Sequence, residues 1–464
     1  MGGAGVTPPT LQLHPGSVPL RIRLEDDSFS FDFAGGRLRR AAYRDLAVIA
    51  VQPNGALLVL GTGPAAPRLV CEQFGSHLGL LVRQLRDRRL RQRMADRFIE
   101  LPRTELIELV EFDVWRSFAG LPGDPAVPGS LVTPSVASAP SASGVGQLAY
   151  HAGGFVLAPV EERDPWLVVP RGHVGSVTLH PDAGEVIVKT VDGVLVRLLR
   201  LGEAAFHHGQ RLDALRRSAL ADASALVQAL IPDAPFDARD RASALLVDGR
   251  PADPGTLGAA WASLESAVLT VPPFAESYRA LVQAAGGGEA VRWLSVAPES
   301  PGSDQPRSWF MVALPGNLVA MELVSEGAHA TYCFRAVPRA SYAGEAPESM
   351  RPAFNAAVAF LSDALLDVRF LREPIGLPDA ALAAPEYTRY RLAMGVLPSL
   401  VAARAAFVAR LVHDAGWAAA LDDLVRWHGT CRDDAAEWPG RAAQEATITE
   451  LSETGGTSPA GAPG

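Results

Sequence analysis

Residues 119–146 constrain the fold most, because they divide the chain into segments that need separate hydrophobic cores. This stretch, AGLPGDPAVPGSLVTPSVASAPSASGVG, consists mainly of small residues and proline, which is typical of an interdomain linker. Residues 1–16 and the tail from about residue 432 are similarly low in complexity. Between these stretches lie blocks of about 100, 85 and 190 residues, and a chain of 464 residues is expected to hold two to four domains.

The first block has short strand-like runs followed by one long helical segment. LRIRLE and SFSFDF begin the block, and Asn54-Gly55 separates the apolar runs LAVIAV and ALLVLG. An Asn-Gly pair between two such runs predicts a β-hairpin. The helical segment extends from Ser76 to about Phe98.

The second block repeats this order. Runs such as GFVLAPV, VGSVTLH and EVIVKT precede a helical segment from about His207 to Leu230. In a direct alignment Leu46, Ile49, Val51 and Pro53 match Val174, Val177, Leu179 and Pro181, and Val82, Leu85, Arg86 and Leu90 match Leu212, Leu215, Arg216 and Leu220. The repeat indicates a duplicated module of about 80–85 residues.

This order of antiparallel strands and one closing helix resembles the pleckstrin-homology-like (PH-like) domains, and two tandem copies would cover about 200 residues. The resemblance implies a small β-barrel or sandwich in each block. Lipid-binding members carry basic residues on the first two strands, and here Arg23 with Arg37 and Arg39 imitates that pattern. The second block has YHAGGFVLAPV instead. The family also includes peptide- and protein-binding domains, so the resemblance alone assigns no function.

The third block predicts a different, α+β domain. Helical segments at about 237–285 precede the strand-like runs AVRWLSV, SWFMVAL, NLVAMELV and ATYCFRAV, and further helices follow. A third, diverged sheet-plus-helix module and an independent α+β domain both fit. The predicted fold class is therefore α+β, with two tandem β-barrel or sandwich modules and this C-terminal domain. The predicted boundaries are 1–16 disordered, 17–116 first PH-like module, 117–146 flexible linker, 147–232 second PH-like module, 237–430 α+β domain and 431–464 disordered tail.

The helix of the first block combines two apolar faces with a run of arginine. Residues 83–98, RQLRDRRLRQRMADRF, hold seven arginines in sixteen positions. At about 100° per residue, Leu78, Leu81, Val82 and Leu85 share a face that can close a small β module. Leu90, Met94 and Phe98 lie on nearly the opposite side. This second stripe must be buried by the following segment, by another domain or by a partner chain, and we carry it as a candidate partner contact.

The arginines have two interpretations. They either form a solvated face paired with acidic neighbours, or they bind an anionic partner. The candidate anion-binding residues are Arg37, Arg39, Arg86, Arg89, Arg93 and Arg97. Because Lys189 is the only lysine, arginine is the default cation of this chain. The net charge of −9 and the lack of interleaved aromatic residues disfavour nucleic acid.

Motifs for catalysis, cofactors or metals are absent from the sequence. No phosphate loop, dinucleotide fingerprint, nucleophile elbow or HExxH occurs, so we predict no cofactor, no metal and no assigned catalytic residue. A weak candidate metal set comprises His413, Asp422, His428 and Cys431. A polar-aromatic cluster at a helix start is a second candidate partner contact and comprises Tyr387, Arg389, Tyr390 and Arg391.

Three features predict a cytoplasmic protein, which we expect to be bacterial. Cys71, Cys333 and Cys431 are sparse and odd in number, no signal peptide is visible, and no apolar run reaches the length of a membrane span. The sequence therefore predicts a non-enzymatic scaffold or adaptor that binds a protein partner. Two alternatives stay open, namely an unrecognised active site in the C-terminal domain and peripheral binding to an anionic membrane surface through the arginine helix.

Overall fold

The computed structural model consists of two compact units, which are described separately. Of the residues described, unit 1 holds those up to Leu215 and unit 2 those from Arg216 onward. The structure describes residues 20–33, 39–61, 68–71, 74–102, 105–116, 140–160, 166–270, 272–299, 306–324, 330–339, 342, 348–394, 397–431, 433 and 436–440. The predicted disordered segment 1–16 lies outside these residues, as do 117–139 of the predicted linker.

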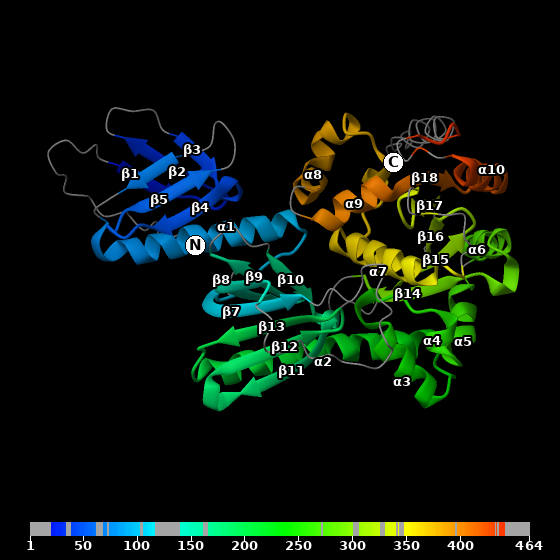
Figure 1. Ribbon diagram of the computed structural model, residues 1–464, viewed down its shortest axis with the longest axis horizontal. Helices are drawn as coiled ribbons and strands as arrows, with labels where there is room; N and C mark the ends of the chain where they lie inside the picture. Colours follow the sequence, from blue (N-terminus) through cyan, green and yellow to red (C-terminus); the bar gives the residue numbers. More distant parts are fainter. Residues whose placement is uncertain are drawn as a thin grey trace, which may run out of the picture. The chain divides into compact units, whose positions relative to one another are not determined.

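Unit 1 begins with two small antiparallel sheets and a helix (Figure 1). Buried residues from both sheets and from the first half of α1 form one core, which includes Phe29, Ile49 and Leu85. The arrangement is therefore a sandwich closed by a helix. The elements are β1 (Leu20–Leu24), β2 (Ser28–Phe33), β3 (Arg39–Ala42), η1 (Tyr43–Asp45), β4 (Leu46–Val51), β5 (Leu57–Gly61), β6 (Arg68–Cys71) and α1 (Leu78–Asp96).

The second part of unit 1 is a seven-stranded antiparallel sheet in the order β10-β9-β8-β7-β13-β12-β11. Two meanders, β7 to β10 and β11 to β13, are joined where β13 pairs with β7. The elements are β7 (Glu108–Arg116), β8 (Ala142–His151), β9 (Gly154–Pro159), β10 (Leu167–Pro170), η3 (Arg171–His173), β11 (Val174–His180), β12 (Glu185–Thr190), β13 (Val194–Leu199) and α2 (Ala204–Leu230). The first half of α2 packs on this sheet, and the division between the units falls within α2.

The two parts of unit 1 share local geometry that the sequence repeat predicts. A three-residue 3-10 helix precedes β4 and another precedes β11. The pairing register shifts near the start of both strands, between Leu46 and Val48 and between Val174 and Ser176. The hairpin turns that follow contain Gly55 and Gly184, each with a positive φ. Such bulges and turn glycines position the strand residues in the same way in both parts.

Unit 2 contains a five-stranded antiparallel sheet, in the order β14-β15-β16-β17-β18, between two helical layers. Phe310 and Val312 of β15 share a core with α5, α6 and α10, whereas the alternate residue Trp309 donates a hydrogen bond to Ser362 of α7. The elements are α3 (Phe236–Leu245), α4 (Pro254–Leu257), α5 (Ala260–Val268), α6 (Pro272–Ala284), β14 (Arg292–Pro298), β15 (Pro306–Leu314), β16 (Leu318–Val324), β17 (Ala330–Arg335), α7 (Arg351–Asp367), η8 (Glu373–Gly376), α8 (Thr388–Met394), α9 (Pro398–Ala406), β18 (Phe407–Val412) and α10 (Trp417–Thr430).

The predicted mixed α+β class is confirmed, and of the two forms predicted for the modules, barrel or sandwich, the barrel is not found among the described residues. Within the described ranges, none of the four sheets closes on itself. Three boundaries also differ from the prediction. Residues 108–116 form β7 at the centre of the second sheet and not part of the first module, and β8 begins at Ala142, inside the predicted linker. The predicted tail starts too early, because Trp438 is buried and its indole N–H binds the carboxylate of Asp423 at 3.0 Å.

Candidate functional site

Three predicted anion-binding arginines of α1 bind the chain's own backbone. β4 is an edge strand of its sheet, so some of its carbonyl groups have no partner among the described strands. Guanidinium groups of α1 donate hydrogen bonds to these carbonyls, from Arg86 to Ile49 (2.8 Å), from Arg89 to Ala47 (2.9 Å) and from Arg93 to Leu46 (2.8 Å). Arg89 is only 1% exposed. These side chains therefore close the edge of β4.

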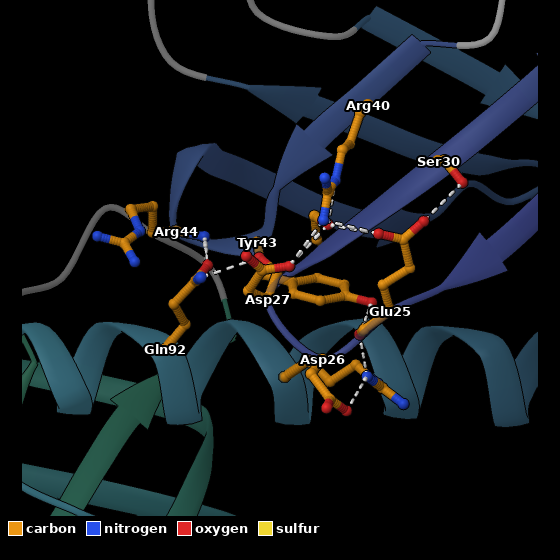
Figure 2. Close-up of polar contacts among 10 residues, drawn as sticks. Glu25, Asp26, Asp27, Ser30, Arg40, Tyr43, Arg44 and Gln92 are labelled. Carbon is orange, nitrogen blue, oxygen red and sulfur yellow. Dashed lines mark hydrogen bonds and ion pairs between the residues drawn. The ribbon is translucent and has the colours of Figure 1, made fainter. Parts of the chain in front are cut away.

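The same helix also holds the acidic turn between β1 and β2 (Figure 2). The Gln92 amide donates a hydrogen bond to the Asp27 carbonyl at 2.9 Å, and its oxygen accepts the Arg44 N–H at 2.7 Å. Arg40 of β3 forms ion pairs with Glu25 at 2.7 Å and with Asp27 at 3.2 Å. The three consecutive acidic residues 25–27 thus lie beside Arg40, the basic residue of β3. This turn therefore repels an anionic surface instead of attracting one.

The remaining predicted basic residues are placed as follows. The Arg97 guanidinium lies 5.8 Å from the Trp166 ring centroid, and that of Arg93 lies 5.3 Å from it. Arg37 lies outside the described residues, and Arg39 is described only as part of the β3 backbone. The ring of Trp166 therefore adds a cation–π contact to the packing of α1.

The predicted partner-contact stripe is buried within this chain. Leu90 and Met94 are fully buried, and they pack with Ala149 of β8 and with Val156 of β9. Phe98, just beyond the end of α1, is 8% exposed. Of the three alternatives for this stripe, the structure therefore shows burial within the same chain. The second apolar face of α1 covers the outer face of the neighbouring sheet in unit 1.

The outer edge of β11 differs from that of β4. β11 is the last strand of its sheet, and no other described strand pairs with its outer edge. Ser176, Thr178 and His180 are exposed, while Val177 and Leu179 are half-buried. An exposed row of backbone N–H and C=O groups is a template for a further strand. This open edge is the first candidate binding site of unit 1.

An aromatic side chain lies near this edge. Gly209 of α2 is so close to Leu179 that a Cβ atom at residue 209 would lie 3.6 Å from the Leu179 side chain. Phe206 is one turn earlier on the same side of α2, and it is 59% exposed. We use the name β11 edge groove for the surface formed by Val177, Thr178, Leu179, Phe206 and Gly209. It combines a strand edge with an apolar residue that helical spacing places one turn from the contact at Gly209.

A buried polar cluster holds α2 to the sheet in unit 1. The Tyr150 hydroxyl and Nδ1 of His208 lie 2.9 Å apart, and Nε2 of His208 lies 3.4 Å from the Glu108 carboxylate. Burial lowers the pKa of His208 and raises that of Tyr150. The Arg211 guanidinium covers the Tyr150 ring at 4.0 Å. The cluster is enclosed, which fits a packing role.

Unit 1 also has a small cavity of about 150 Å³. Its lining is mainly apolar and includes Phe112, Leu157 and Leu167. The hydroxyl of Ser141, which also lines it, donates a hydrogen bond to the Val114 carbonyl at 2.8 Å. The cavity therefore brings together no set of titratable groups.

Unit 2 brings four polar side chains together at the junction of β16, β17 and α10. Nε2 of His413 lies 3.0 Å from both the Glu322 carboxylate and the Thr331 hydroxyl. Thr331 also contacts Glu322, and it accepts a hydrogen bond from the Trp417 indole at 3.0 Å. A nucleophile–base–acid relay needs one imidazole nitrogen for each partner. Here both partners meet the same nitrogen, so the geometry is not that of a relay.

The weak candidate metal set does not assemble. Nδ1 of His428 lies 2.8 Å from a guanidinium nitrogen of Arg339, and burial lowers the pKa of His428 to about 3. His413 contacts Glu322 instead. No group of three or more metal-binding side chains occurs in the part of the chain that the structure describes.

The polar-aromatic cluster is split between the protein interior and its surface. Tyr390 of α8 is 1% exposed, whereas Arg389 and Arg391 are exposed. Tyr387, in the 3-10 turn that precedes α8, is half-buried. The sequence pattern alone did not separate the buried tyrosine from its exposed neighbours.

Comparison with known proteins adds no assignment. No family model matches the chain, and no curated protein matches it significantly. In the described helices, none is long and apolar enough to cross a membrane.

Proposed function

We propose that this chain is a non-enzymatic adaptor that binds an extended peptide segment of a partner protein along the β11 edge groove. The observation that carries the proposal is the contrast between two equivalent strand edges. Arginines of α1 occupy the carbonyls of β4, while no described strand pairs with the outer edge of β11 and Phe206 of the closing helix is exposed. A strand that adds to this edge gains main-chain hydrogen bonds, and its side chains gain apolar contact.

We further propose that the two parts of unit 1 are tandem PH-like modules. The order of strands and helix in each part supports this proposal. In the second part, seven antiparallel strands in two meanders precede one helix. In the first part, six described strands in two sheets precede one helix. The first module then serves as a rigid support for the second, because α1 packs on both.

The membrane alternative has less support. It requires free arginines on α1, yet Arg86, Arg89 and Arg93 donate hydrogen bonds to β4. It also requires a basic surface near β1 and β2, where Glu25 and Asp27 lie instead. A protein partner is therefore the better hypothesis for unit 1.

The test is selection of a phage-displayed random peptide library on the full chain. We expect enriched peptides to bind in fluorescence anisotropy and to protect β11 amides from hydrogen exchange. Phe206→Asp should weaken their binding at least about tenfold, because a charge replaces the apolar anchor. Phe236→Asp is the matched control, since Phe236 lies on α3 and is 71% exposed.

Two outcomes would contradict the proposal. One is a library that yields no binder. The other is a binder that leaves the β11 amides unprotected and binds the Phe206 and Phe236 variants equally well. Circular dichroism of both variants would show that each keeps the fold of the parent chain.

A further inference from the structure

Two arginines flank one tyrosine on the α8 and α9 side of the unit 2 sheet. Tyr332 of β17 lies directly opposite Arg410 of β18 in the strand register. The Arg410 guanidinium is 5.8 Å from the Tyr332 ring centroid, and the guanidinium of Arg372, just before η8, is 4.7 Å from it. Two positive charges therefore lie around one ring, although they come from distant segments of the chain.

Neither guanidinium has a carboxylate or carbonyl partner among the described residues. Within the described ranges, Nη1 of Arg372 and Nε of Arg410 are both buried without an acceptor. Arg404, on the adjacent helix α9, is different, because it donates to the carbonyls of Pro374 and Leu377 and to the Asp379 carboxylate. A buried cation without a partner is costly, and two neighbouring cations repel each other as well.

The surroundings position these groups without neutralising them. Arg404 holds the η8 segment that follows Arg372. Burial raises the pKa of the Tyr390 hydroxyl, while the nearby Arg404 guanidinium lowers it. The nearest acidic groups are Glu373, which is exposed, and Glu322, on the other face of the sheet. Neither forms an ion pair with Arg372, whose pKa is lowered by burial.

We propose that Arg372 and Arg410 form a binding site for a phosphate group, beside the ring of Tyr332. Guanidinium groups donate several hydrogen bonds to the oxygens of such an anion, and its negative charge removes the repulsion between the two cations. The site lies in unit 2 and is independent of the peptide groove proposed for β11. The phosphate could come from the free ion or from a phosphate ester, since both present the same oxygens.

The test uses isothermal titration calorimetry on the full chain, with inorganic phosphate and phosphoserine as probes. We expect saturable binding of at least one probe, and at least about tenfold weaker binding in Arg372→Gln and in Arg410→Gln. Arg372→Lys should retain part of the affinity, because it keeps the charge but loses the planar fork. Arg391→Gln is the matched control, since Arg391 is an exposed arginine of α8. Tighter binding of phosphoserine would identify a phosphate ester as the source of the phosphate group. Tighter binding of inorganic phosphate would identify the free ion as its source.

Two results would overturn the site. In the first, the parent chain binds neither probe at concentrations up to about 20 mM. In the second, Arg391→Gln weakens binding as much as Arg372→Gln does. The anion would then bind through the overall positive charge of the surface and not at this site. Because Arg372→Gln could alter the fold, phosphate-dependent thermal stabilisation is measured alongside it. The site is supported if phosphate raises the melting temperature of the parent chain, raises that of Arg372→Lys by less, and does not raise that of Arg410→Gln.

Discussion

The two parts of unit 1 share a framework but differ at one strand edge. Both have a 3-10 helix, a shifted register at the start of the next strand and a helix that closes the sheet. In the aligned helices, Arg89 and Arg93 of α1 correspond to Ala219 and Ala223 of α2. Arg86, which also binds β4, keeps an arginine as its counterpart, Arg216. The edges therefore differ at two of the three positions, where alanines lack the donors that Arg89 and Arg93 supply to β4. The comparison teaches that side chains on the closing helix decide whether an edge strand stays available.

The second halves of α1 and α2 are also alike, because each packs into the hydrophobic core that follows its own sheet. Leu90 and Met94 of α1 leave the first module and pack on β8 and β9. In α2, Ala219 and Ala223 form a cluster with Val247, and Leu226 joins the main core of unit 2. Each helix therefore completes one core and contributes to the next. The boundaries of the hydrophobic cores therefore do not coincide with the low-complexity segments that the sequence analysis used to divide the chain.

The largest expected effect comes from the second apolar face of α1. Leu90→Ala should lower the free energy of unfolding by about 2–5 kcal/mol, because Leu90 is fully buried in this cluster. Leu80→Ala is the matched control. Leu80 is on the same helix but 52% exposed, so its loss should cost less than about 0.5 kcal/mol. Urea denaturation measures both values. Equal costs would show that the second face of α1 has no part in the core.

The next effect tests the closed edge itself. Arg89→Met should cost about 2–3 kcal/mol, since it removes a charged hydrogen bond and leaves the Ala47 carbonyl without its donor. Arg83→Met is the control, because the Arg83 side chain is 53% exposed and, among the described residues, pairs only with Asp87, at 3.9 Å. Hydrogen exchange should become faster in β4 than in β11 of the Arg89 variant. An unchanged β4 would mean that the arginine does not close this edge.

A smaller effect is the dependence of folding stability on pH, which we expect to arise in the second part of unit 1. Burial lowers the pKa of His151 to about 4 and also lowers that of His208, and both belong to the second part. A histidine with a depressed pKa in the folded state contributes stability above its unfolded pKa of about 6.5. That contribution is lost as the pH falls from about 6.5 toward 4. We expect a loss of roughly 1–3 kcal/mol for His151.

The measurement is urea denaturation at pH 7 and near pH 4.5 for the parent chain and for His151→Gln. The variant should lose less stability on acidification than the parent chain does. His428, whose pKa is about 3, contributes equally to both proteins and cancels in the difference. Equal losses would show that His151 is not held neutral in the folded state.

The sequence predicted the elements of unit 1 better than it predicted their assembly. The Asn54-Gly55 turn and the strand–helix repeat are local signals, and the structure has strands and helices at these places. The two faces of the 78–98 helix were also visible, but sequence spacing does not identify the surface that buries Leu90. The arginines were misleading for the same reason. Their partners are carbonyls of β4, which are about 40 residues away and have no side-chain signature.

The candidate sites were even less predictable, because they depend on contacts between distant segments. Arg372 and Arg410 meet at Tyr332 only after β18 pairs with β17. Within the cluster at 387–391, the sequence could not show that Tyr390 points inward and Arg391 outward. Phe206 was overlooked because a single apolar residue at the start of a helix is common. The signal that could have drawn attention to it is the repeat, where Phe206 aligns with the polar Ser76.

The smallest expected effect on stability concerns Phe206 itself. Because the side chain is 59% exposed, Phe206→Ala should change the free energy of unfolding by less than about 0.5 kcal/mol. Leu212→Ala, two turns later on α2 and fully buried, should cost about 2–5 kcal/mol in the same denaturation experiment. A cost above about 1.5 kcal/mol for Phe206 would mean that its ring packs onto the fold and fills the β11 edge groove. The two edges would then both be closed, one by arginine and one by phenylalanine, and the peptide-binding proposal would lose its anchor.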